Sequence, residues 1–160
     1  MPLPLLAITL GDPSGVGPEI ILKALRHPEV FQVCRPLIVG DARILRRAAE
    51  WLNTYDSVIP LVFERVADPA SGLYNPGSIS LLDLSNADPT ACRVGQVCPC
   101  SGQAAVEYVF AACDLALAGK VDGIVTAPLN KEAMNLAGFH YAGHTELLTE
   151  RTHAQKVSML

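Results

Sequence analysis

The sequence predicts a three-layer α/β/α fold, in which helices cover both faces of a largely parallel sheet. Short apolar runs alternate along the chain with segments that carry an apolar stripe at helical spacing. Three of these runs, residues 5–10, 36–39 and 123–126, each end in turn-forming residues, as buried parallel strands do. Half of the 160 residues are hydrophobic and only 18% are charged, which indicates a globular domain and excludes a disordered chain. We expect the three runs to share one sheet.

A glycine-rich turn, Gly11 to Gly17, follows the first predicted strand and leads into a helix. Gly15-Val-Gly17 matches part of the dinucleotide-binding pattern, but Ile20 stands where that pattern requires its third glycine. We favour a tight turn whose glycines relieve crowding, with Asp12 capping the backbone locally. This interpretation leaves Asp12 and Glu19 as candidates for a role in a ligand-binding cleft.

The middle of the chain continues the alternation of strands and helices. Residues 36–39 precede a predicted helix over residues 42–52, whose basic side chains we expect on a solvated face: Arg43, Arg46 and Arg47. Turn-forming residues separate two more predicted strands, at residues 61–66 and 79–82. Residues 85–103 are polar, and we expect them to form an irregular connection.

A long helix is predicted over residues 102–118. Its apolar stripe places Cys113 in the core and consists of Val106, Val109, Phe110, Cys113 and Leu117. After the strand at residues 123–126, we expect a helix that ends near Thr152, and residues 156–160 begin like another strand.

The five cysteines are an odd number scattered through a chain without an export signal, so we interpret them as reduced thiols. Cys98-Pro-Cys100, with Cys92 upstream, suggests a metal cluster as an alternative. The Cys-x-Cys spacing is not the usual one for a zinc hook, and we therefore favour thiols.

Polar side chains gather after the strand at residues 123–126, and in open α/β sheets ligands bind at this end of a strand. Asn130 is placed to cap a short helix. A loop bounded by Gly138 and Gly143 then leads to His144-Thr145, where Thr145 is expected to cap the next helix. We expect a loop that delivers these side chains to a helix N-terminus to hold a phosphate or carboxylate.

His140 and His144 stand four residues apart, which on a helix would make a metal-binding pair. Gly143 lies between them, so we expect one histidine to bond the loop and treat His144 as the functional candidate. Lys131 is either a solvated residue of a first helical turn or a cation for an anionic substrate. The remaining histidines are interpreted as surface residues: His27 and His153.

The net charge of -4 gives no general attraction to nucleic acid or to anionic membranes. The apolar run at Leu3 to Leu10 is too short to span a bilayer and lacks the basic start of a signal peptide. We therefore expect a cytoplasmic protein without a nucleic-acid or membrane partner.

Three motifs together resemble the 4-hydroxythreonine-4-phosphate dehydrogenase family: Thr9-Leu-Gly-Asp-Pro-Ser-Gly-Val-Gly-Pro-Glu19, Thr126-Ala-Pro-Leu-Asn-Lys-Glu132 and Gly143-His-Thr-Glu146. The first motif is also similar to the opening of isocitrate and isopropylmalate dehydrogenases, whose broad fold the family shares. The run from Pro128 to Leu148 looks closest to a sister branch that oxidises 4-phospho-D-threonate or 4-phospho-D-erythronate.

The resemblance implies a homodimeric, NAD- or NADP-dependent dehydrogenase that needs a divalent metal such as Zn, Mg or Co. Such enzymes oxidise the C3 hydroxyl of a 4-phosphorylated hydroxy acid, which then loses carbon dioxide, and they supply a precursor of pyridoxal phosphate. The resemblance assigns substrate-binding roles to His144 and Thr145, and leaves catalytic and cofactor-binding residues unassigned.

The family's three metal-binding histidines and most of its NAD site have no counterpart in these 160 residues. The resemblance therefore implies that residues 1–160 are the N-terminal α/β portion of a longer two-domain dehydrogenase, with the metal ligands beyond residue 160. On this basis the chain by itself is expected to be inactive, or to act only as a phosphate-binding fragment.

Overall fold

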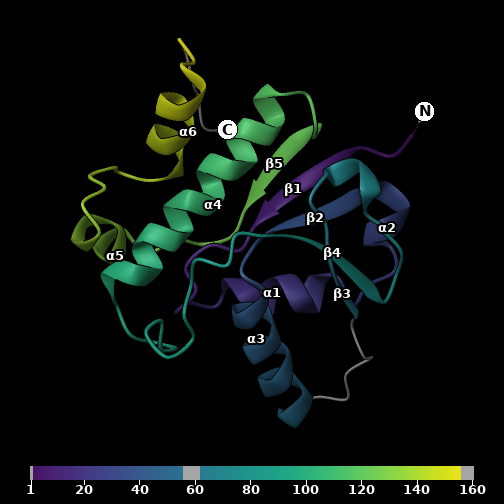
Figure 1. Cartoon of the computed structure of the whole chain (residues 1–160), viewed down its shortest axis with the longest axis horizontal. Helices are drawn as coiled ribbons and strands as arrows, with labels where there is room; N and C mark the ends of the chain where they lie inside the picture. Colours follow the sequence, from purple (N-terminus) through teal and green to yellow (C-terminus); the bar gives the residue numbers. More distant parts are fainter. Residues whose placement is uncertain (1, 56–61, 156–160) are drawn as a thin grey trace.

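A five-stranded parallel sheet forms the centre of the molecule, in the strand order β3-β4-β2-β1-β5 (Figure 1). The computed structural model describes residues 2–55 and 62–155. The strands are β1 (Leu5–Thr9), β2 (Arg35–Gly40), β3 (Val62–Arg65), β4 (Ser78–Asp83) and β5 (Gly123–Thr126). β1 lies beside both β2 and β5, so the prediction of one shared sheet is confirmed. The strand predicted at residues 156–160 lies outside the described residues, as does position 61.

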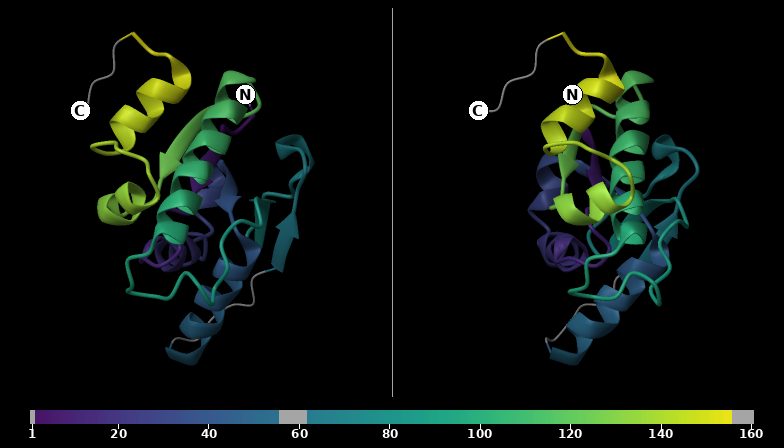
Figure 2. Two further views of the ribbon diagram at one scale, coloured as in Figure 1. Left: turned by 60° about the vertical axis from the view of Figure 1, so that its left-hand side comes forward. Right: turned by 90° about the vertical axis from the view of Figure 1, so that its left-hand side faces the viewer.

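Helices flank the sheet on both sides, which confirms the predicted α/β class. They are α1 (Gly17–Ala24), α2 (Val30–Val33), α3 (Ala42–Tyr55), α4 (Pro99–Leu117), α5 (Lys131–Leu136) and α6 (His144–Thr152), with a 3-10 turn at Pro69–Ser71. Figure 2 shows α4 on one face of the sheet and α1 and α2 on the other. α5 and α6 pack on α4, and α1 packs on α3. In the described parts of the chain, every helix is too short or too polar to serve as a membrane span.

α4 begins three residues earlier than the sequence pattern predicts, because Cys98 acts as its N-cap and Pro99 occupies the first turn. One side of this helix belongs to the main core through Tyr108 and Ala112, which are both fully buried. Its other side joins α5 and α6 in a second apolar cluster: Val106, Val109, Cys113, Met134 and Leu147. Cys113 therefore packs in the core as predicted, whereas Leu117 at the helix end is 60% exposed, contrary to the predicted stripe.

The contact between α4 and α5 depends on a glycine. A Cβ atom added to Gly102 would lie 2.1 Å from the Ala133 carbonyl oxygen and 2.5 Å from the Met134 nitrogen. Only a residue without a side chain allows the two helices this separation. Gly102 thus sets the position of α5, and with it that of Lys131 at the helix start.

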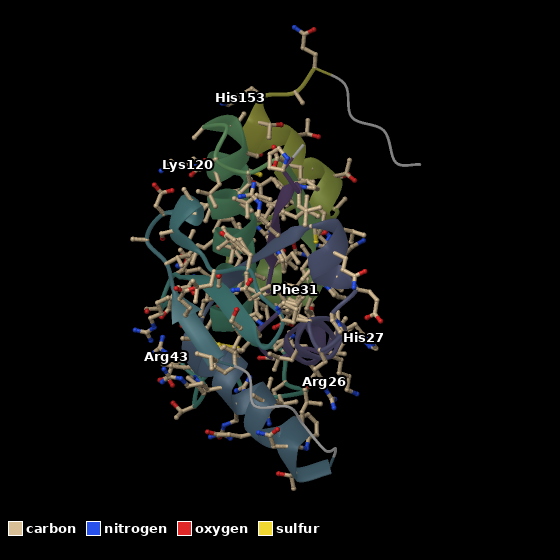
Figure 3. The ribbon with its side chains drawn as sticks, turned by 90° about the vertical axis from the view of Figure 1, so that its right-hand side faces the viewer. Arg26, His27, Phe31, Arg43, Lys120 and His153 are labelled. Atoms are coloured by element: carbon tan, nitrogen blue, oxygen red, sulfur yellow. A yellow bond between two sulfur atoms is a disulfide. The ribbon has the colours of Figure 1, made fainter. Side chains whose placement is uncertain are left out.

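Arg47 corrects the prediction that all three arginines of α3 are solvated. Its guanidinium donates to the backbone carbonyls of Pro13 (2.6 Å), Pro89 (3.1 Å) and Cys92 (2.6 Å). The side chain joins the turn after β1 to the irregular segment that connects β4 to α4. Arg43 and Arg46 are exposed as predicted, and Arg43 lies at the outside of α3, where it pairs with the buried carboxylate of Asp41 (Figure 3).

Asp41 fixes the same region from the end of β2. Its carboxylate accepts hydrogen bonds from the Ala87 and Arg43 backbone N–H groups, both at 2.8 Å. Burial raises the pKa of this carboxyl, but the bonds from Arg43 and Ala87 outweigh burial and leave the pKa below its ordinary value. The segment after β4 is therefore irregular in shape but held at several points.

We expect Arg47→Ala to lower the free energy of unfolding by about 3 kcal/mol, because three charge-assisted bonds to backbone carbonyls are lost. Arg46→Ala is the matched control on the same helix, and its exposed side chain should change stability by less than about 0.5 kcal/mol. Urea unfolding of the two variants measures the difference. Equal stability of the two would show that the Arg47 contacts contribute nothing.

Candidate functional crevice at the ends of β1 and β5

The carboxyl ends of β1 and β5 meet at one edge of the sheet. Thr9 is paired with Thr126 at the last position of the shared ladder. The Ala127 N–H donates to the Thr9 carbonyl at 3.3 Å, and the Asp12 N–H donates to the Pro128 carbonyl at 2.9 Å. In the sheet, β5 lies on one side of β1 and β2 lies on the other, and the chain runs from β1 to β2. β1 and β5 therefore border the kind of crevice in which α/β proteins bind ligands.

Gly11 allows the two turns to approach each other this closely. Its φ angle is +71°, in the region that favours glycine, and a Cβ atom here would lie 2.4 Å from the Pro128 carbonyl oxygen. Gly11 and Gly17 therefore serve close backbone packing, in agreement with the favoured interpretation, since a Cβ atom on Gly17 would lie 2.4 Å from the Leu10 carbonyl oxygen, whereas Gly15 is not crowded. Asp12 also behaves as predicted, since its buried carboxylate accepts from the Ser14 N–H at 2.8 Å.

His144 is the first residue of α6 and lies against the turn after β5. Its imidazole hydrogen-bonds to the backbone of Ala127. Burial lowers the pKa of His144 below its ordinary value, and the bond to Ala127 opposes this shift only in part. Nε2 is buried and has no hydrogen-bond partner in the part of the chain that the structure describes. A buried nitrogen without a partner needs an explanation, and a catalytic or ligand-binding role is one of those known for such groups.

Lys131 lies close to the same point. Its Cε is 4.0 Å from the position that a Cβ atom would take on Gly143, the residue before His144. The structure thus brings a cation from the start of α5 to the start of α6, although 12 residues separate Lys131 from Gly143 along the chain. The side chain of Lys131 is exposed, and the Glu146 carboxylate lies near the same point, with its Oε2 3.8 Å from that Cβ position.

Thr145 does not cap α6 as the sequence suggested. The helix begins at His144 with Gly143 as its N-cap, so Thr145 lies inside the first turn. Its carbonyl accepts from the Thr149 hydroxyl at 2.6 Å, and the side chain is half-buried. With glycine at the cap, α6 starts two residues earlier than it would with Thr145 as the cap. Asn130, by contrast, caps α5 as predicted, through its bond from the Ala133 N–H at 3.0 Å.

Two buried hydroxyl groups near the crevice were not singled out from the sequence. Thr9 at the end of β1 and Ser14 in the following turn are both buried, and neither hydroxyl has a partner among the described residues. The sequence feature that could have identified Thr9 is the presence of this polar residue within the apolar run of residues 5–10. Glu19 lies in the first turn of α1 and is partly exposed.

The three other histidines are exposed, so none of them is buried beside His144 as a second metal ligand would be. His140 is exposed on the loop before α6. Within residues 2–55 and 62–155, the one group of three potential metal ligands consists of cysteines and contains no histidine. His27 and His153 are surface residues as predicted, and Figure 3 shows them at the outside of the molecule, far from each other.

The cysteine prediction was wrong for one pair. Cys98 and Cys100 form a disulfide, whereas Cys34, Cys92 and Cys113 are free. The bend at the N-cap of α4 sets the two Cα atoms 5.4 Å apart, which is within the range that a disulfide requires. This separation depends on the helix start, which was predicted three residues too late.

Comparison with known proteins agrees with these motifs and this fold. The family model described as pyridoxal phosphate biosynthetic protein PdxA matches residues 32–160. The chain belongs to the PdxA family. It is 40% identical over 157 residues to the 4-hydroxythreonine-4-phosphate dehydrogenase of Desulforapulum autotrophicum, covering 98% of this chain and 45% of that protein. It is 43% identical over 149 residues to a protein of Symbiobacterium thermophilum named "Putative D-threonate 4-phosphate dehydrogenase", covering 93% and 43%.

A solved PdxA-family structure matches the fold over nearly the whole chain. The crystal structure of a 4-hydroxythreonine-4-phosphate dehydrogenase from Burkholderia phymatum superimposes with a TM-score of 0.90 at 38% identity, covering 98% of this chain and 46% of that one. The chain therefore spans about half the length of the PdxA-family proteins it matches.

Proposed function

We propose that this PdxA-family chain belongs to an NAD- or NADP-dependent dehydrogenase that oxidises a 4-phosphorylated 3-hydroxy acid with decarboxylation. We take 4-phosphonooxy-L-threonine, on the route to pyridoxal phosphate, as the substrate. The alternative is 4-phospho-D-threonate or 4-phospho-D-erythronate, and the names of the relatives include both classes. The observation that carries the proposal is the buried, unpartnered Nε2 of His144 beside Lys131, at the crevice between β1 and β5.

These two residues suit the anionic part of such a substrate. A phosphate or carboxylate placed at the start of α6 would meet the positive end of the helix, the Lys131 ammonium and the imidazole of His144. The anion would raise the pKa of His144, so that the imidazole takes up a proton as the substrate binds. Thr145, in the first turn of α6, adds a hydroxyl group to the same proposed site.

The described residues do not supply a site for the divalent metal at this crevice. Their one group of three potential ligands is made of cysteines, which do not suit Mg²⁺. We therefore assign no step to the metal here and place its ligands, with most of the nicotinamide site, outside these residues.

The test is the reduction of NAD and, separately, NADP by the whole gene product. We expect NADH or NADPH to form with 4-phosphonooxy-L-threonine, and to stop when a chelator removes the metal. A rate that is higher with the D-threonate or D-erythronate phosphate would select the alternative substrate. No reduction with any of the three phosphates would contradict the dehydrogenase proposal.

A protein of these 160 residues alone should turn over no substrate. Hydride transfer needs the hydroxy acid, the metal and the nicotinamide within reacting distance. In this proposal the 160 residues provide only the part of the site that binds the anionic group of the substrate. Weak phosphate binding should survive, because His144, Lys131 and the start of α6 remain. Assays with each phosphate, either nicotinamide cofactor and added metal should stay at background, while calorimetry detects inorganic phosphate. Metal-dependent reduction above a heat-killed control would contradict this expectation.

We also propose a homodimer located in the cytoplasm. The support for the dimer is an apolar hollow between α1 and β5, lined in part by Ile20 and Val125, whose side chains are 47% and 45% exposed. Surfaces of this kind in soluble proteins are usually covered by a partner or by a further domain. Sedimentation of the whole gene product should give a dimer, and a monomer at all concentrations would contradict the proposal.

A further inference from the structure

Three sulfur atoms gather near the start of α4, in the segment that Arg47 joins to the turn after β1. Cys92 comes from the irregular segment between β4 and α4, whereas Cys98 and Cys100 come from the start of α4. Their Sγ atoms all lie within 4.8 Å of one another, and those of Cys92 and Cys100 are 3.4 Å apart. Cys92 is fully buried, and the other two side chains are half-buried. We call these residues the cysteine trio.

Contacts that do not involve the sulfur atoms hold the trio in place. Arg47 bonds the Cys92 carbonyl, and the Gly95 N–H donates to the Ser14 carbonyl at 2.8 Å. The Ser101 hydroxyl donates to the Cys98 carbonyl at 3.0 Å. The backbone around the three sulfurs is therefore fixed whether or not Cys98 and Cys100 are joined, and a preorganised site loses little entropy when a ligand binds.

The surroundings favour a bound cation over a free thiolate. Burial raises the pKa of the Cys92 thiol, and the positive charge of Arg47 opposes this only in part. Cys98 and Cys100 lie at the positive end of a 19-residue helix, where the Cys98 sulfur already accepts from the Ser101 N–H at 3.3 Å. The helix end and the Ser101 N–H therefore stabilise negative charge on the Cys98 sulfur, and all three thiols lose their protons as the cation binds.

We propose that the reduced trio binds one thiophilic metal ion, Zn²⁺ or Cu⁺, and that the Cys98–Cys100 disulfide closes the same site. Sulfur ligands select soft ions and disfavour Mg²⁺ or Ca²⁺. Zn–S bonds of about 2.3 Å place tetrahedral thiolates roughly 3.8 Å apart. The 3.4 Å between the Cys92 and Cys100 sulfurs is close to that spacing, and the Cys98 and Cys100 sulfurs separate to van der Waals distance once the disulfide is reduced.

The disulfide-bonded state and the metal-bound state are connected by reduction with a dithiol. A dithiol transfers two electrons and two protons to the Cys98–Cys100 disulfide, which yields two thiols and converts the reductant to its own disulfide. The metal ion then displaces the three thiol protons as the three sulfur–metal bonds form. Oxidation by a disulfide such as glutathione disulfide reverses the sequence and releases the metal.

The site is separate from the metal implied by the family resemblance, which involves histidine ligands. Among the described residues, no fourth His, Cys, Asp or Glu has a ligand atom within 4.8 Å of all three sulfurs. Zn²⁺ would therefore complete its shell with water on the half-buried side, whereas Cu⁺ would remain bound by the three sulfurs. The ordinary alternative is that Cys92 only packs in the core, as buried free cysteines often do.

The experiment titrates the whole gene product, reduced with a dithiol and freed of metal, separately with Zn²⁺ and with Cu⁺. Cd²⁺ is added in a third arm, since its thiolate charge-transfer absorption distinguishes sulfur ligands from histidine and carboxylate. We expect one equivalent of metal with a thiolate absorption, retained after desalting in addition to any metal held by the histidine site, and we expect this equivalent and its absorption to be absent from protein oxidised with glutathione disulfide. The ion is identified by the arm, Zn²⁺ or Cu⁺, in which the reduced protein retains one equivalent more than the oxidised protein.

The variants Cys98→Ser and Cys100→Ser should each lose this equivalent and its absorption. Because both side chains are half-buried, these variants are expected to fold, and circular dichroism checks that they do. Cys34→Ser is the control, because Cys34 is a buried free cysteine outside the trio, and it should bind metal as the unaltered protein does. The absence of a thiolate absorption in the reduced protein, or its persistence in either trio variant, would overturn the proposal.

Discussion

Gly102→Ala should separate α5 from α4 and destabilise the protein by about 2 kcal/mol. Overpacking costs about 3 kcal/mol when a side chain meets fixed backbone, and the higher helix propensity of alanine offsets about 1 kcal/mol of this. The added Cβ would lie 2.1 Å from the Ala133 carbonyl oxygen, so the backbone of α5 must move. Urea unfolding of the whole gene product measures the loss.

The displacement of α5 has a second consequence, because this helix begins with Lys131. We expect Gly102→Ala to weaken phosphate binding as well as stability. Gly15→Ala is the control, since a Cβ there meets nothing closer than 3.4 Å and the backbone is not in the left-handed region. If Gly102→Ala were as stable as Gly15→Ala, the close packing of α4 on α5 would not hold in solution.

His144→Ala should reduce kcat/KM for the phosphorylated substrate by about ten- to a hundredfold, the equivalent of about 1.5–3 kcal/mol for one charge-assisted hydrogen bond. The affinity for NAD should stay nearly unchanged, because most of the cofactor site lies elsewhere. His140→Ala is the control: this histidine is exposed, only four residues away, and should leave the kinetics unaltered. Unaltered kinetics for His144→Ala would remove His144 from the site.

The same residue should make the stability of the ligand-free protein depend on pH. The folded pKa of His144 is below its ordinary value of 6.5, so the unfolded state binds the extra proton first as the pH falls. The stability that neutral His144 provides is present above pH 6.5 and is lost as the pH falls through the folded pKa. His144→Gln should remove this part of the acid-side loss in thermal unfolding, and an unchanged pH profile would contradict it.

The sequence predicted the sheet because the signals for its strands are local. The apolar runs at residues 5–10, 36–39 and 123–126 and the turns after them depend only on near neighbours in the chain, and each became a strand within about a residue. The site proposed around His144 was also predicted from adjacent residues, since Gly143, His144 and Thr145 follow one another and their motif is distinctive. The boundary of α4 was less accurate, because a cysteine is an unusual N-cap.

The tertiary structure alone decided which distant groups meet. The three carbonyls that bind Arg47 are brought together by two loops far apart in sequence, so a pattern of basic residues on one helix could not reveal them. The cysteine trio and the approach of Lys131 to Gly143 arise in the same way. The sequence by itself determined the layers and the ends of the strands, because apolar periodicity and turn chemistry act over a few residues. Only packing through the whole chain determined the partners of its polar side chains, since those partners come from separate loops and helices.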